Sequence, residues 1–336
     1  MKPQWWWAFL LVLAAASFLS KGAGAAEPVR IRVGWVVATT QITPVLLEKK
    51  ELLRHYGKSY IFEPLHFNGS TPQIPALAAR ELEIAALAYS SFGLTVQNAK
   101  MDIKIIADMF QDGVPGYYST NYMVRADSPI RTVADLRGKT LATNAIGGAV
   151  DVAARVMLRK HGMEDKRDYT IVEARFPAME AMLREEKIDA AGMVQPFYHE
   201  AMSRGGLRTL FTQREAVGVT DMIFWAARTE FLTQHRAAMV DFLEDTIRSV
   251  RWQMDPKNRE EATTIIARFI KKKPEGLRPW LFTGQDIYRD PNAMPNLDAL
   301  QSNVDLLREL GFLKERMDVR QHADLSLLEA ARARLK

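Results

Sequence analysis

β-rich segments alternate with helical segments along most of the chain, and this alternation constrains the fold more than any other feature. Val29 to Trp35 alternates in the manner of a strand, Tyr60 to Phe67 predicts a second strand, and Ile84 to Ala88 is a short run of small apolar residues. Segments rich in helix formers lie between them. Strands and helices at this spacing are typical of βαβ units, so we expect an α/β fold with a largely parallel sheet.

The same alternation runs through the middle of the chain and ends in a helical C-terminal part. Further strands are expected at residues 102–110, 118–125, 139–143, 169–174, 188–194, 207–211 and 221–227. Helices are expected at 43–57, 72–81, 150–161, 177–186 and 197–205, and Tyr89-Ser90-Ser91 is expected to be a turn. From Thr229 onward the spacing of apolar residues indicates only helices, at 231–254, 259–271, 297–310 and 325–335.

A weak internal repeat divides the strand-rich part in two. The run Arg80 to Ala86 is similar to the run Arg184 to Ala190, and each ends a helix and begins a buried strand of small residues. We therefore expect two similar α/β lobes, with the strands near 118–126 and 220–228 crossing between them. Because ligands of open α/β sheets bind beyond the carboxyl ends of the strands, two facing lobes predict a cleft that closes by a hinge.

The expected domain boundaries follow from the two crossovers. Residues 27–118 together with 222–336 would form the first lobe and the C-terminal helices, and 119–221 would form the second lobe. Residues 1–26 have the form of a secretory signal peptide, with a charged Lys2, an apolar run from Trp5 to Leu19 and small residues around Ala25 for cleavage. A retained membrane anchor is the alternative, but the run is short for a span. We expect a cleaved, periplasmic protein.

The stretch from Leu136 to Ala149 leaves a short strand, turns over Gly147-Gly148 and enters a helix. Backbone N–H groups at a helix start have no intrahelical partner, and the helix dipole adds partial positive charge there. Glycines allow a ligand to approach the backbone closely, so this turn could cradle an anion. The stretch is neither a dinucleotide fingerprint nor a P-loop. A plain strand-to-helix turn is the alternative.

Composition removes several classes of function. The net charge is +5, yet the basic residues are scattered, with only Lys271-Lys272-Lys273 as a short run, which argues against nucleic-acid binding. The chain contains no cysteine, so disulfides, thiolate metal sites and thiol nucleophiles are excluded. The six histidines lie far apart without metal-ligand spacing, and no G-x-S-x-G motif is present. We expect no catalytic residues, no metal and no cofactor.

Three motifs resemble those of a known family. They are the first strand ending in Gly34-Trp35, the helix–strand pair from Glu81 to Ala88, and the run from Asp135 to Leu141 before a glycine-containing helix start. With the export signal, they resemble the sulfonate/nitrate/taurine-type periplasmic binding proteins of ABC importers. The resemblance implies a two-lobed, periplasmic binding protein type II-like fold. It also implies a monomer that binds a small organic anion, a sulfonate or carboxylate, and delivers it to an ABC permease.

The resemblance places six loops at the cleft, and the aromatic Trp35 could wall it. The loop residues so implied are Thr39, Thr40, Gln41, Ser70, Tyr89, Ser90, Thr143, Asn144, Gly147, Gly148, Phe176 and Gln195. The acid group of the solute is expected at the helix start after Gly148, with donors from Asn144 and Thr143. Arg175, at the end of an expected strand, is a rival counter-ion. Relatives often carry a hydroxyl residue where this chain has Gly148-Ala149, so a hydroxyl contact there is in doubt.

Other functions stay open from the sequence alone. The same scaffold could carry an exported enzyme or a sensor partner, or could bind a pyrimidine or thiamine precursor. A related pyrimidine synthase relies on a cysteine-rich motif, so the absence of cysteine argues against that enzyme here. Because the protein is expected to be exported, a cytosolic biosynthetic enzyme fits poorly.

Overall fold

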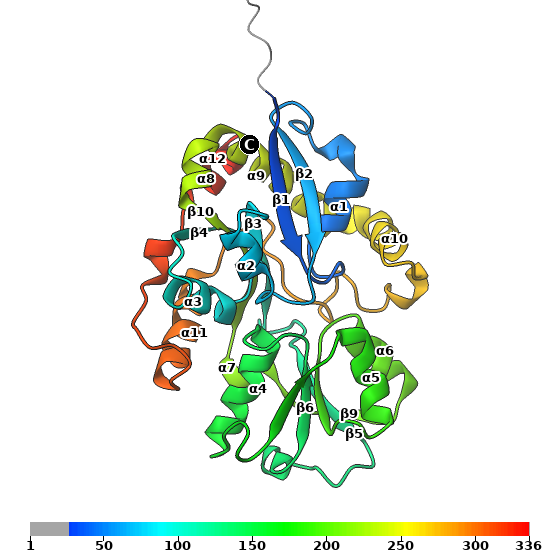
Figure 1. The fold of residues 1–336 in the computed structure, drawn as a ribbon. Coiled ribbons are helices and arrows are strands. Elements are labelled where there is room, and N and C mark those ends of the chain that lie inside the picture. Colours follow the sequence, from blue (N-terminus) through cyan, green and yellow to red (C-terminus); the bar gives the residue numbers. More distant parts are fainter. Residues whose placement is uncertain (1–26, 336) are drawn as a thin grey trace, which may run out of the picture.

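The computed structural model describes residues 27–335, which form ten strands in two five-stranded sheets (Figure 1). The expected signal peptide lies outside the described residues. The first sheet has the order β2-β1-β3-β10-β4. Its strands are β1 (Val29–Trp35), β2 (Tyr60–His66), β3 (Ile84–Leu87), β4 (Ile103–Asp112) and β10 (Thr220–Arg228). Together with the helices packed on it, this sheet forms the upper lobe of Figure 1, called the first lobe below.

The second sheet, in the lower lobe of Figure 1, has the order β7-β6-β8-β5-β9. Its strands are β5 (Asn121–Arg125), β6 (Thr140–Thr143), β7 (Thr170–Glu173), β8 (Ala190–Met193) and β9 (Leu207–Thr212). In each sheet four strands run parallel and one runs antiparallel. The antiparallel strands are β10 and β5, and each is the one that the chain enters from the other lobe. The expected crossovers and the two-lobed α/β fold are therefore confirmed. The expected domain boundaries stay a prediction.

The internal repeat is real in structure, but its register differs by two residues from the sequence match. In the first lobe the Arg32 N–H donates to Glu83 at 2.8 Å, and the Glu83 N–H donates to the Arg32 carbonyl at 3.0 Å. In the second lobe Thr140 and Asp189 exchange the same two bonds, at 2.9 and 2.8 Å. A carboxylate thus joins β1 to β3 in the first lobe and β6 to β8 in the second. Glu83 corresponds to Asp189, whereas the sequence match aligned it with Lys187.

The helices cover the sheets on both faces (Figure 1). Those of the first lobe are α1 (Thr43–Glu48), α2 (Gln73–Ala78), α3 (Tyr89–Gln97), α8 (Thr229–Gln234), α9 (Arg236–Met254), α10 (Arg259–Phe269), α11 (Leu297–Glu309) and α12 (Ser326–Ala333). Those of the second lobe are α4 (Ala149–Lys160), α5 (Phe176–Arg184), α6 (Phe197–Arg204) and α7 (Gln213–Val217). Five 3-10 turns lie at Lys50–Leu52, Val133–Leu136, Pro256–Asn258, Pro274–Gly276 and Val319–His322.

Three expected elements were wrong. The helix expected at 43–57 ends at Glu48 and is followed by a 3-10 turn, after which the buried Asp245 carboxylate binds the N–H groups of Arg54 and His55 at 3.0 Å each. The turn expected at Tyr89-Ser90-Ser91 is the first turn of α3. Ser91 Oγ accepts from the Ala88 N–H at 2.9 Å and so satisfies a donor at the helix start. The helix expected at 231–254 is broken at His235.

The core of the first lobe lies between its sheet and α9. Phe242 of α9 stacks on Trp225 of β10, with ring centroids 5.3 Å apart, and meets Tyr60 of β2 edge-on at 5.2 Å. All three side chains are almost fully buried. Aromatic pairs at these separations contribute to stability beyond their buried area.

Among the described residues, no helix is long and apolar enough to cross a membrane.

Candidate ligand-binding cleft

An inner cavity lies between the lobes, where loops leave the carboxyl ends of the parallel strands. Its empty volume is about 580 Å³, including the part open to solvent. Its apolar lining consists of Val36, Val37, Ala88, Phe110, Tyr118, Ala149, Val150, Phe176, Val194, Met222, Ile223 and Ile287. Its remaining lining consists of Thr40, Gln41, Gly69, Ser70, Thr120, Asn144, Gly148 and Gln195. None of these described lining residues carries a charged side chain or an imidazole. The cavity suits a ligand that is largely apolar.

Gln41, which lines this cavity, holds a buried hydrogen-bond donor of fixed orientation. The side chain is 3% exposed, and its Oε1 accepts from the Val36 N–H at 2.7 Å. That bond fixes which end of the amide is oxygen. Nε2 is buried and has no hydrogen-bond partner among the described residues. An unpaired buried donor is costly, so Nε2 is a candidate partner for an oxygen or nitrogen of a ligand.

The start of α4 forms another wall of the cavity, as expected from the glycine turn. Gly148 is the N-cap residue and has an ordinary φ of −75°. Its N–H donates to the Ala145 carbonyl at 3.1 Å, and the Gly147 N–H donates to the Asp151 carboxylate at 2.7 Å. Burial raises the pKa of Asp151, although the ion pair with Arg155 opposes that shift. A carboxylate of the chain itself therefore occupies part of the expected anion cradle.

An outer cavity adjoins the inner one at the mouth of the cleft. Its empty volume is about 1310 Å³, including open solvent. Val36, Val37 and Phe176 line both cavities, so they form an apolar throat between them. The wall of the outer cavity is aromatic, with Trp35, His66, Phe67, Phe197 and Phe269, and the rim is charged, with Arg175, Glu180, Glu200, Arg204 and Lys272.

The lobes are closed on each other in this structure. Asn144 of the second lobe donates to the Asn68 carbonyl of the first at 2.9 Å. The Tyr89 hydroxyl donates to the Ala149 carbonyl at 3.2 Å, and the Thr39 hydroxyl donates to the Gln195 carbonyl at 3.4 Å. These contacts come from the loops after the strands of both sheets. Opening the cleft would break all of them.

The structure separates the expected ligand-binding residues into three groups. Those lining the inner cavity are Thr40, Gln41, Ser70, Asn144, Gly148, Phe176 and Gln195, and those lining the outer one are Trp35, Thr39, Arg175 and Phe176. Tyr89, Ser90, Thr143 and Gly147 line neither. Tyr89 is fully buried beside the lobe contact, Thr143 is buried within the end of β6, and Ser90 and Gly147 border a separate cavity behind α4. Their predicted contacts with a ligand therefore have no support from this geometry.

Several lining residues were absent from the sequence-based set. Val36 and Val37 follow the first strand directly, so their position in a cleft loop could have been predicted from the sequence. Met222 and Ile223 lie in β10, which was expected to be an ordinary crossover strand. Ile287 belongs to the irregular segment before α11, and no sequence pattern marks that segment as part of a site.

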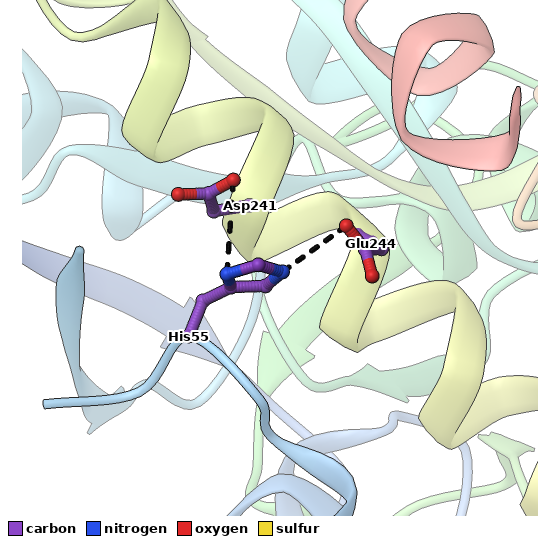
Figure 2. Close-up of side chains that lie close together, drawn as sticks. All are labelled: His55, Asp241 and Glu244. Atoms are coloured by element: carbon purple, nitrogen blue, oxygen red, sulfur yellow. Dashed lines mark hydrogen bonds and ion pairs between the residues drawn. The ribbon is translucent and has the colours of Figure 1, made fainter. Parts of the chain in front are cut away.

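A cluster outside the cleft brings together His55, Asp241 and Glu244 (Figure 2). The two ring nitrogens of His55 face different carboxylates, Nε2 at 3.1 Å from Glu244 and Nδ1 at 3.9 Å from Asp241. Arg248 pairs with Glu244, and Arg334 pairs with Asp241 at 2.6 Å. Because the carboxylates already have cationic partners and one imidazole cannot direct both nitrogens at one ion, the cluster has the chemistry of an ion-pair network.

A buried acid pair lies on two neighbouring strands of the first sheet. Asp108 of β4 and Asp221 of β10 are 2% and 0% exposed, and among the described residues neither oxygen of Asp108 has a hydrogen-bond partner of good geometry. Burial raises the pKa of Asp221 to about 7. Burial and the neighbouring Asp221 raise the pKa of Asp108 well above its usual range. At least one proton is therefore held by the pair near neutral pH.

This pair predicts a loss of stability as pH rises. An unfolded aspartate has a pKa of about 3.9, so between that value and the raised folded pKa the folded state binds more protons. The free energy of unfolding should therefore fall as pH rises from about 4 through about 7. Asp221→Asn should flatten this slope, and Asp127→Asn, at an exposed site, should not. Urea unfolding of the three proteins at pH 5.5 and 8 measures the change in the free energy of unfolding with pH. Equal slopes for wild type and Asp221→Asn would contradict the assignment.

Comparison with known proteins identifies the family. The model of the NMT1-like family matches residues 24–267. The chain belongs to the NMT1-like family. It is 25% identical over 256 residues to a putative aliphatic sulfonates-binding protein of Bacillus subtilis (strain 168), covering 73% of this chain and 74% of that protein. The expected relationship to periplasmic binding proteins of ABC importers is thereby confirmed.

Solved structures share the fold of this NMT1-like protein. The periplasmic nitrate-binding protein NrtA of Synechocystis PCC 6803 matches with a TM-score of 0.72 at 16% identity, over 93% of this chain and 90% of that one. The desulfurization enzyme DSZB matches with a TM-score of 0.65 at 15% identity, over 92% of this chain and 100% of that one. At such identities the likeness shows the fold alone, which serves both binding and catalysis.

Proposed function

We propose that this protein is an exported solute-binding protein that captures a small organic acid in the cleft and delivers it to an ABC-type permease. The observation that carries the proposal is the inner cavity, which is apolar and uncharged and contains the fixed, unpaired donor of Gln41. Ligand sites of this kind are concave and mostly apolar, with few polar groups that set orientation. The name of the Bacillus relative supports a sulfonate or carboxylate, aliphatic or aromatic, as the ligand.

The geometry gives each part of such a ligand a place. Gln41 Nε2 and the first N–H groups of α4 can donate to an oxygen of the ligand. The apolar walls, among them Phe176 and Ile223, would cover its hydrocarbon part. Closure of the lobes, through contacts such as Asn144 to Asn68, would then shield the bound molecule from water.

Binding is favoured over catalysis by the lining itself. No described lining residue of the inner cavity has a carboxyl, imidazole or amine group that could act as a general acid or base. Export to the periplasm and action as a monomer belong to the same proposal. A sensor-partner protein and a binder of pyrimidine or thiamine precursors are the alternatives to this proposal.

We expect a thermal-shift screen to find the ligand class. The panel consists of aliphatic and aromatic sulfonates and carboxylates, nitrate, and pyrimidines. A true ligand at 100 times its Kd should stabilise the folded protein by about 2.7 kcal/mol. Nitrate, which has no apolar part, should stabilise least among the true binders. A response to pyrimidines alone would overturn the organic-acid proposal.

A further inference from the structure

We infer that the mouth of the cleft holds a second subsite, centred on Arg175, that binds an anionic group. The ligand is therefore a diacid with an apolar middle. The inference rests on the proposed function and specifies the ligand class. The two cavities differ in the polar groups that line them. The inner one offers uncharged donors, above all Gln41 Nε2, whereas the cationic side chains lie in the outer one.

Arg175 differs from the other cations of the outer cavity. Arg204 pairs with Glu180 and with Glu200, and Lys272 pairs with Glu200 across the lobes. Arg175 makes no ion pair and no side-chain hydrogen bond with any of the described residues. Its guanidinium therefore has all its donors available, and a guanidinium binds a carboxylate or sulfonate through two parallel bonds.

The chain connects this cation to the inner cavity through a single aromatic residue. Arg175 is the N-cap residue of α5, and Phe176 is its first helical residue. Phe176 lines both cavities and stacks on Phe197, with centroids 5.8 Å apart and planes 18° apart. With Val36 and Val37 it forms the apolar throat. A ligand whose inner end meets Gln41 and whose outer end meets Arg175 must therefore pass apolar atoms through that throat.

Matched pairs of acids test this inference by calorimetric titration of the full protein. The probes are heptanedioate against heptanoate and benzene-1,4-dicarboxylate against benzoate. Each pair differs in the outer acid group alone. At least one diacid should bind about 10- to 100-fold more tightly than its monoacid, as expected for a hydrogen bond to a charged group. Raising the salt concentration should reduce this preference, because the mouth is exposed.

Substitution of the arginine then assigns the preference. Arg175→Ala should bring the diacid-to-monoacid ratio close to one. Arg131→Ala, which removes an exposed arginine of the second lobe outside both cavities, should leave the ratio unchanged. Equal affinities within each pair in the wild type, or a ratio that survives Arg175→Ala, would overturn the second subsite and leave the proposed function standing. If neither diacids nor monoacids bind, and no compound of the thermal-shift screen stabilises the protein, the proposed function is overturned as well.

Discussion

Replacing Gly34 with alanine is expected to lower the free energy of unfolding by about 3 kcal/mol or more. A Cβ atom at Gly34 would lie 2.0 Å from Gln73 Oε1 and 2.7 Å from Gln73 Cδ. Gln73 is fully buried. Its Oε1 accepts from the Ala86 N–H at 2.8 Å, and its Nε2 donates to the carbonyls of Gly69 and Ala86 at 3.2 Å each. Displacing the amide would leave buried groups unpaired, at about 1–3 kcal/mol each.

Two controls make this prediction specific. Gly276→Ala adds a methyl group where nothing lies within 4 Å, and it should change stability by about 0.5 kcal/mol or less. In a Gln73→Ala background, Gly34→Ala should cost little more, because the atoms it strikes are gone. Urea unfolding of the four proteins measures the cycle. An equal cost of Gly34→Ala in both backgrounds would show that the clash with Gln73 is not its cause.

Arg289→Met is expected to destabilise the protein by about 3–5 kcal/mol, because it leaves the buried Asp286 carboxylate without its counter-ion. Arg289 is 5% exposed and pairs with the fully buried Asp286, Nη1 to Oδ2, at 2.7 Å. Its Nη2 also donates to the Thr39 carbonyl, in a cleft loop, at 2.7 Å. The substitution would leave Asp286 without a counter-ion and Thr39 without that bond.

The same segment contacts both lobes, which adds to the expected effect. The Tyr118 N–H donates to the Asp286 carbonyl at 2.9 Å, and Gln195 of the second lobe donates to the Gln285 carbonyl at 3.1 Å. The double variant Asp286→Asn/Arg289→Met should recover more than half of the loss, because it no longer buries an unpaired carboxylate. Chemical denaturation of the single and double variants decides this. A double variant as unstable as Arg289→Met alone would show that lost packing, and not lost charge compensation, is responsible.

Much of the fold could be predicted because strand and helix periods are local. The ten strands lie near their expected positions, and the repeat of Arg80 to Ala86 foretold two equivalent lobes. The chain just after the first helix and the register of the repeat were predicted wrongly, because both depend on hydrogen-bond partners far away in the sequence. Asp245 binds the chain at Arg54 and His55, where helix was expected, from nearly 200 residues away, and the register of the repeat is set by the carboxylates Glu83 and Asp189.

The site was predictable to the extent that it follows the strand ends. The loops after β1, β2, β6, β7 and β8 all reach the cleft, as expected for the carboxyl edge of a parallel sheet. The sequence could not show that Ser91 would extend α3 backward and bury Tyr89, or that Asp151 would bind the Gly147 N–H. It also could not show that the cavity wall would include Ile287 of the irregular segment. The bonds of Ser91 and Asp151 join residues three and four apart, whereas the burial of Tyr89 and the place of Ile287 depend on packing between parts far apart in the chain.

Calorimetric titration of wild type and Gln41 variants with the strongest ligand of the thermal-shift screen tests the central claim most directly. Gln41→Met removes the donor without adding charge, and Gln41→Glu keeps the acceptor for the Val36 N–H while replacing the donor. Gln234→Leu, at an exposed site on α8, is the matched control. Wild type and control should bind one organic acid per chain, and both Gln41 variants should bind it about 10- to 100-fold more weakly at pH 7.5. Unchanged affinity in both Gln41 variants would show that the acid does not bind in the inner cavity.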